Sequence, residues 1–97
     1  MRGYILAQIN IKDREGFSGY ADKAAPVVAQ YGGKFLVGTG KVETVEGERG
    51  RHRMVLIEFP SLAQARTFYD SPEYQDVLPM RFASSQTELF MAEGLGD

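Results

Sequence analysis

Two stretches of the chain alternate apolar and polar residues, as β-strands do when only one of their faces meets a core. They are YILAQINI, residues 4–11, and HRMVLIEF, residues 52–59. A strand turns successive side chains to opposite faces, so this alternation predicts a sheet that is covered on one side. The side chains expected on the covered side are Ile5, Ala7, Ile9, Ile11, Val55, Ile57 and Phe59.

Helical periodicity separates these strands. Asp13 is the expected N-cap of a first helix. Pro26 should weaken and kink this helix, and Gly32 and Gly33 should end it. Ser61 opens a second helix, with Gln64 three residues later in a capping-box pattern. Ser71 and Pro72 then restart that helix, and Pro79 is expected to end it.

Two further strands complete the pattern. Residues 34–47 read as a long strand that bends near Gly38 to Gly40, and residues 87–93 form the last strand. The order β-α-β-β-α-β predicts an α+β, ferredoxin-like fold, in which a four-stranded antiparallel sheet carries both helices on one face. We expect residues 1–97 to form a single domain.

Composition excludes several classes of function. The net charge is −2, which argues against a nucleic-acid or anionic-membrane surface. The chain has no cysteine, so disulfides, thiolate metal sites and a cysteine nucleophile are excluded. No segment reaches transmembrane length, and the N-terminus is too polar for a signal peptide. We therefore expect a cytoplasmic location and no membrane partner.

The uncovered face of the sheet mixes apolar and polar side chains. Leu6, Met54 and Leu56 fall on it beside Gln8 and Glu58. An open face in water is usually mostly polar, so we expect a second copy of the chain to cover it. The prediction is a homodimer that packs through its sheet faces.

Several motifs resemble a known family. YILAQINI, YGGKFLV, KVETVEG, VLIEFPS and FYDSPEYQ, followed by Arg81, are similar to the bacterial family called domain of unknown function 1330. The resemblance covers roughly residues 3 to 94 and implies the dimeric α/β-barrel superfamily, which includes cofactor-independent monooxygenases, isomerases and haem enzymes. The haem-binding relatives carry their histidine on a helix, where this chain has none, so we expect no haem and no metal.

Glu58 and Arg81 are the best candidates for a catalytic pair. A carboxylate among apolar neighbours either takes up a proton or pairs with a cation, and Arg81 is the expected partner. A structural ion pair is the favoured interpretation. The functional alternative is a proton-transfer carboxylate or an anchor for a polar ligand.

Four other residues are candidates for ligand contacts. Tyr69 and Tyr74 lie on helical apolar stripes and would point to a pocket if one exists, although core packing is the simpler explanation. Lys34 begins a strand and His52, the single histidine, lies at another strand end, where solvation is the simpler explanation.

The function therefore has two open interpretations. One is a small cytoplasmic dimer that binds or converts a small organic molecule in an apolar pocket, without metal or haem. The other is a non-catalytic regulatory or structural dimer. RNA binding is disfavoured, because Met54 and Leu56 stand where RNA-recognition domains of this strand order carry stacking aromatics.

Overall fold

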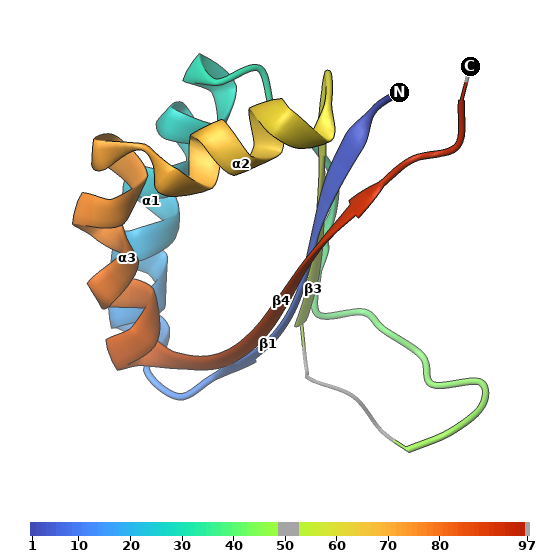
Figure 1. Cartoon of the computed structure of the whole chain (residues 1–97). Helices are drawn as coiled ribbons and strands as arrows, with labels where there is room; N and C mark the ends of the chain where they lie inside the picture. The colour runs from blue at the N-terminus through green and yellow to red at the C-terminus, as the bar shows by residue number, and fades with distance from the viewer. Residues whose placement is uncertain (49–52, 97) are drawn as a thin grey trace.

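The computed structural model of the chain describes residues 1–48 and 53–96. In that part the chain forms four strands and three helices in ferredoxin-like order (Figure 1). The elements are β1 (Gly3–Ile11), α1 (Arg14–Gln30), β2 (Lys34–Thr39), β3 (Arg53–Phe59), α2 (Leu62–Asp70), α3 (Pro72–Ser84) and β4 (Ser85–Glu93). The strands lie in the order β2-β3-β1-β4, and every neighbouring pair is antiparallel, as the sequence predicts.

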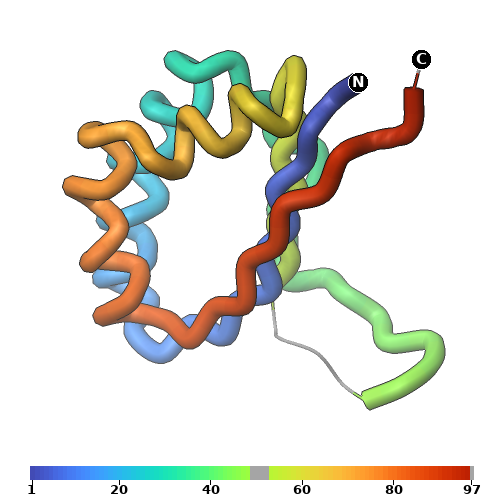
Figure 2. The backbone as a smooth tube through the Cα atoms, in the orientation of Figure 1, coloured from blue at the N-terminus to red at the C-terminus, as the bar shows by residue number. Residues whose placement is uncertain are grey.

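The helices cover one face of the sheet, and the core lies beneath them (Figure 2). Ile5 and Ala7 of β1 are buried there, together with Ile57 and Phe59 of β3. The ring of Phe68 from α2 packs on Phe59 with their centroids 5.3 Å apart. The alternation in the sequence thus decides which side of the sheet the helices occupy.

Each helix begins at the cap that the sequence predicts. The side chain of Asp13 accepts a hydrogen bond from the backbone N–H of Gly16, and Ser61 accepts one from Gln64. Ser71 does the same for Tyr74. The side-chain amide of Gln64 donates to the carbonyl of Tyr31 at 2.9 Å. That bond ties α2 to the end of α1.

Two expectations about element ends were wrong. α3 continues through Pro79 to Ser84, where Pro79 is exposed, so the carbonyl that loses its helical donor faces solvent. β2 ends at Thr39 instead of residue 47, because the Thr39 hydroxyl accepts the N–H of Lys41 and turns the chain. The chain does bend at Gly40, as expected, and a separate bulge lies earlier in β2, between Phe35 and Val37.

The opposite face of the sheet carries no helix in the described residues (Figure 1). Leu6 lies at its centre, with Leu56 and Phe90 as its partners in register on the two neighbouring strands. Phe90 is 51% exposed. An apolar row therefore crosses this face and meets solvent in the single chain. None of the described helices is long and apolar enough to span a membrane.

Candidate ligand-binding cavity

A cavity of about 410 Å³ lies between α1 and the helix-covered face of the sheet. Its walls are the apolar side chains of β1, β3 and α1, with Phe68 and Tyr74 closing the α2 and α3 side. The lining residues are Ile5, Ala7, Phe17, Tyr20, Ala21, Ala24, Ala25, Val28, Phe35, Leu36, Val37, Gly38, Arg53, Val55, Ile57, Phe68, Tyr74, Arg81 and Leu89. This volume falls in the usual range for small-molecule sites.

Small side chains on α1 leave the space open. Ala21, Ala24 and Ala25 present only methyl groups to the cavity, where larger residues would fill it. The cavity opens between α1 and the edge strand β2, where the lining residues Phe35 and Leu36 are 48% and 44% exposed. A ligand would therefore enter past the edge of the sheet.

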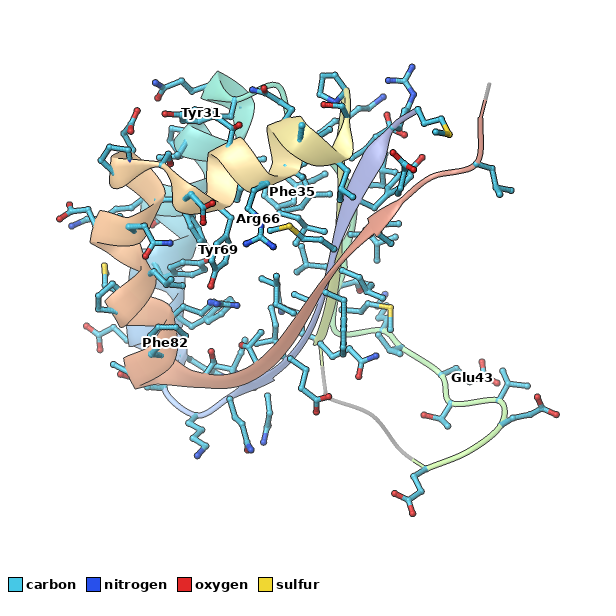
Figure 3. All side chains as sticks on the ribbon, in the orientation of Figure 1. Tyr31, Phe35, Glu43, Arg66, Tyr69 and Phe82 are labelled. Atoms are coloured by element: carbon cyan, nitrogen blue, oxygen red, sulfur yellow. The ribbon has the colours of Figure 1, made fainter. Side chains whose placement is uncertain are left out.

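Two tyrosine hydroxyls meet at the cavity wall. The hydroxyl oxygen of Tyr20 on α1 lies 2.7 Å from that of Tyr74 on α3. Tyr69 extends from α2 toward the sheet side of the helices (Figure 3), and its ring packs on Tyr74 with the centroids 5.5 Å apart. The hydroxyls of Tyr20 and Tyr74 thus supply hydrogen-bond donors in a mostly apolar cavity.

Burial keeps these hydroxyls protonated. Desolvation raises the pKa of the Tyr20 hydroxyl far above its ordinary value, and the neighbouring Tyr74 raises it further. Desolvation likewise raises the pKa of Tyr74, although the charge of Arg81 opposes the shift. Both groups are neutral at physiological pH and can donate hydrogen bonds.

Arg81 is the buried charged group of the cavity. It lies in the last turn of α3, is 4% exposed and lines the cavity. Its Nε is buried and has no hydrogen-bond partner among the described residues. The ring of Phe82 lies 5.4 Å from the guanidinium carbon. A buried, incompletely paired guanidinium is suited to binding an anionic or carbonyl oxygen.

The segment FYDSPEYQ, residues 68–75, aims Tyr74 at the cavity. Ser71 breaks the helix, accepting the N–H of Tyr74 and donating its hydroxyl to the carbonyl of Phe68 at 2.7 Å. Glu73 then receives the Tyr31 hydroxyl at 3.0 Å, which holds the start of α3 against the end of α1. The motif thus fixes the angle between α2 and α3.

Comparison with known proteins identifies the family. The family model named domain of unknown function, DUF1330, matches residues 2–95. This chain belongs to the DUF1330 family. The resemblance seen in its motifs is therefore confirmed.

Several solved structures that are similar to this DUF1330 chain share its fold. A protein of unknown function from Rhodopseudomonas palustris superimposes with a TM-score of 0.79 and 19% identity, covering 99% of this chain and 84% of that one. SnoaB, a cofactor-independent oxygenase from Streptomyces nogalater, gives 0.70 and 11% over 99% and 95%. A dimeric ferredoxin-like protein of unknown function from Jannaschia sp. CCS1 gives 0.69 and 11% over 97% and 100%. No curated protein sequence matches the chain.

The expected pairing of Glu58 with Arg81 is wrong. Glu58 lies on the open face of the sheet, where the hydroxyl of Tyr4 donates to it at 3.1 Å and Arg2 approaches to 3.8 Å. Arg81 lies on the helix-covered side, so the sheet separates the two. Register decides this, because Glu58 stands between Ile57 and Phe59, whose side chains are buried under the helices.

The other residues that were predicted to contact a ligand lie partly at the cavity and partly away from it. Tyr74 of this DUF1330 chain lines the cavity, and Tyr69 packs behind it. Lys34 is exposed and is the register partner of Glu58, away from the cavity. His52 lies outside the described residues. The described residues contain no cluster of three or more metal-ligating His, Cys, Asp or Glu side chains.

Sequence reasoning missed Tyr20 and Arg53 as cavity residues. Tyr20 shares the helical stripe of Phe17 and Ala24, which reads as plain core. Arg53 is the register partner of Ile9, whose side chain is buried under the helices, so strand parity could have placed it on the covered face. The alanines at positions 21, 24 and 25 were the other feature of the sequence that could have indicated a cavity.

Proposed function

We propose that this DUF1330 protein binds a small organic molecule in the cavity between α1 and the sheet. The observation that carries the proposal is the cavity itself: about 410 Å³ of space, mostly apolar, into which Tyr20, Tyr74 and Arg81 converge. Protein interiors are normally close-packed, and a space of this size beside polar groups is typical of a ligand site.

We also propose that the protein works as a homodimer. Leu56, Leu6 and Phe90 form an apolar row across the open face, and a second copy stacked on this face would remove that row from water. The loop at residues 40–48 extends on the side away from the helices (Figure 1), where a second copy would contact it. Val45 in that loop is 84% exposed in the single chain. The fold is also shared with a structure described as dimeric.

The likeness to SnoaB extends to the fold, at 11% identity, and oxygenation is not carried over from it. Binding alone fits a sensing dimer, and binding followed by conversion fits an enzyme. The two are distinguished by incubating the protein with a compound that it binds and then recovering that compound. A changed compound indicates an enzyme, and an unchanged one indicates a non-catalytic binding protein.

Thermal-shift screening tests the cavity. A panel of charged and neutral aromatic and aliphatic compounds should include members that raise the melting temperature in proportion to their concentration. Ala24→Leu places a larger side chain in the cavity, so it should fold and lose the stabilisation. Ala29→Leu is the matched control, since Ala29 is exposed on the same helix and does not line the cavity.

Two results would contradict this proposal. One is a panel in which no compound, charged or neutral, stabilises the protein. The other is an Ala24→Leu protein that responds to the same compounds as fully as the Ala29→Leu control.

A further inference from the structure

We infer that the ligand is an apolar molecule with a carboxylate group, and that the Arg81 guanidinium holds that carboxylate. The inference rests on the proposed function, since it names the chemical class that the same cavity takes. It makes Arg81 the anchor of the site and the tyrosine pair its auxiliary donors.

The first step is the missing counter-charge. Arg81 is 4% exposed, and its buried Nε has no hydrogen-bond partner among the described residues. No carboxylate within residues 1–48 and 53–96 forms an ion pair with it. A buried charge without a partner is strongly unfavourable, whereas the same charge with a bidentate carboxylate is a common recognition unit.

The second step is that the surroundings compensate this charge only in part. The C-terminal end of α3 and the face of Phe82, at 5.4 Å, both favour a cation. Neither one is an acceptor for the N–H of Nε. The guanidinium therefore keeps hydrogen-bonding capacity at the wall of the cavity that it lines.

The third step is that the tyrosines do not supply the anion. Desolvation raises the pKa of both Tyr20 and Tyr74, so neither becomes a tyrosinate beside Arg81 at neutral pH. Their hydroxyls bond to each other at 2.7 Å, and this pair has one proton left to donate. An incoming carboxylate oxygen could accept that proton while the other oxygen meets the guanidinium.

The fourth step concerns the rest of the ligand. Arg53 brings a second positive charge to the cavity, and none of its described lining residues is acidic. The remaining walls are aliphatic and aromatic, including Ile57, Val55 and Phe68. A molecule with one carboxylate and an apolar body satisfies both the charge and the walls, while a polyol or a cation satisfies neither.

The experiment compares acids with neutral molecules of the same shape. Hydrocinnamate is paired with hydrocinnamide, and octanoate with octanamide, in thermal-shift and calorimetric titrations of the full chain. We expect at least one carboxylate to bind at millimolar concentration or below, and its amide to bind at least about tenfold more weakly. Amides that bind as well as the acids overturn the inference, and so does the failure of both acids to bind.

Arg81→Met separates a ligand anchor from a structural residue. An apolar side chain of similar length removes the buried charge, so the ligand-free variant should be as stable as the parent or more stable. It should lose at least about tenfold in affinity for the carboxylate and keep its affinity for the amide. Arg66→Met is the matched control, because Arg66 is an exposed arginine of α2 that pairs with Asp70 and should leave carboxylate affinity unchanged.

The variant results overturn the inference in two ways. The first is an Arg81→Met protein that binds the carboxylate as tightly as the parent. The second is an Arg81→Met protein that unfolds in the absence of ligand while Arg81→Lys, which keeps the charge, shows no carboxylate binding. Neutral compounds that still stabilise the protein in those cases leave the proposed cavity function standing, so the two failures are distinguishable.

Discussion

The hydroxyl of Tyr20 on α1 and the hydroxyl of Tyr74 on α3 lie 2.7 Å apart at the wall of a cavity. Helices α1 and α3 are not consecutive in the chain, so this bond fixes their spacing across the interior. It also makes each hydroxyl depend on the other, because Tyr74 is buried and has few alternative partners.

Tyr20→Phe should lower the free energy of unfolding by about 1–2 kcal/mol, because it leaves the Tyr74 hydroxyl without its partner. Tyr74→Phe should act similarly. The double variant removes both polar groups and should cost clearly less than the sum of the two. Urea unfolding at one protein concentration measures all four proteins, and strictly additive losses would show that the hydroxyls do not interact.

Alkaline titration should separate these tyrosines from the others. Burial raises the pKa of Tyr20 and Tyr74 above the ordinary value of 10.0. A raised pKa in the folded state contributes stability that is fully present below pH 10.0 and is lost as the pH rises through the folded-state value. Tyrosinate absorbance of the native protein should therefore lag behind that of the urea-unfolded chain, and unfolding should accompany the late step. Superimposable curves would contradict the burial.

Glu73→Gln should weaken the junction between α1 and α3. The pKa of Glu73 is lowered, first by its own backbone N–H at the start of α3 and then by the Tyr31 hydroxyl. A lowered pKa gives stability that is present above the ordinary value of 4.5 and is lost as the pH falls. The parent should be more stable than the variant at neutral pH, and this difference should shrink below pH 4.5. Glu46→Gln, in the exposed loop, should show no such trend.

Local chemistry in the sequence predicts much of this fold. The alternation around Ile57 gives the covered face of the sheet, and Ser71 with Pro72 gives the break between α2 and α3, because both signals act over a few residues. The prediction that Pro79 ends the helix was wrong, since a proline destabilises a helix less when it lies in an exposed turn and the other side of the helix is packed. Propensity alone does not include that packing.

The candidate site depends on information that no local pattern holds. The cavity exists because α1 presents small side chains toward the sheet. The distance between α1 and the sheet is set by all the residues that pack around them. Strand parity already placed Glu58 on the face away from the helices, which argued against Arg81 as its partner. The bulge after Phe35 shifts the register of β2, and its position could not be predicted from the glycines that follow.

Leu6→Glu should convert the proposed dimer into a monomer. Leu6 lies between Leu56 and Phe90 in register, at the centre of the apolar row, so a carboxylate there would be buried in the interface without a partner. Light scattering at micromolar concentration measures the mass. Ala63→Glu is the control, because Ala63 is exposed on α2, on the other side of the sheet. A parent protein that is monomeric, or a Leu6→Glu protein that stays dimeric, would contradict the interface.

Gly3→Ala should be among the most damaging single substitutions. A Cβ at Gly3 would lie 2.4 Å from the backbone N and Cα of Leu62, and backbone at the start of α2 cannot turn aside as a side chain can. We expect a loss of about 1–3 kcal/mol or more, since α2 must move away from β1. Gly38→Ala is the matched control, because its Cβ would meet no atom within 4 Å, and its stability should change by less than about 0.5 kcal/mol. Urea unfolding of the two variants decides the matter, and equal stabilities would show that α2 does not rest on Gly3.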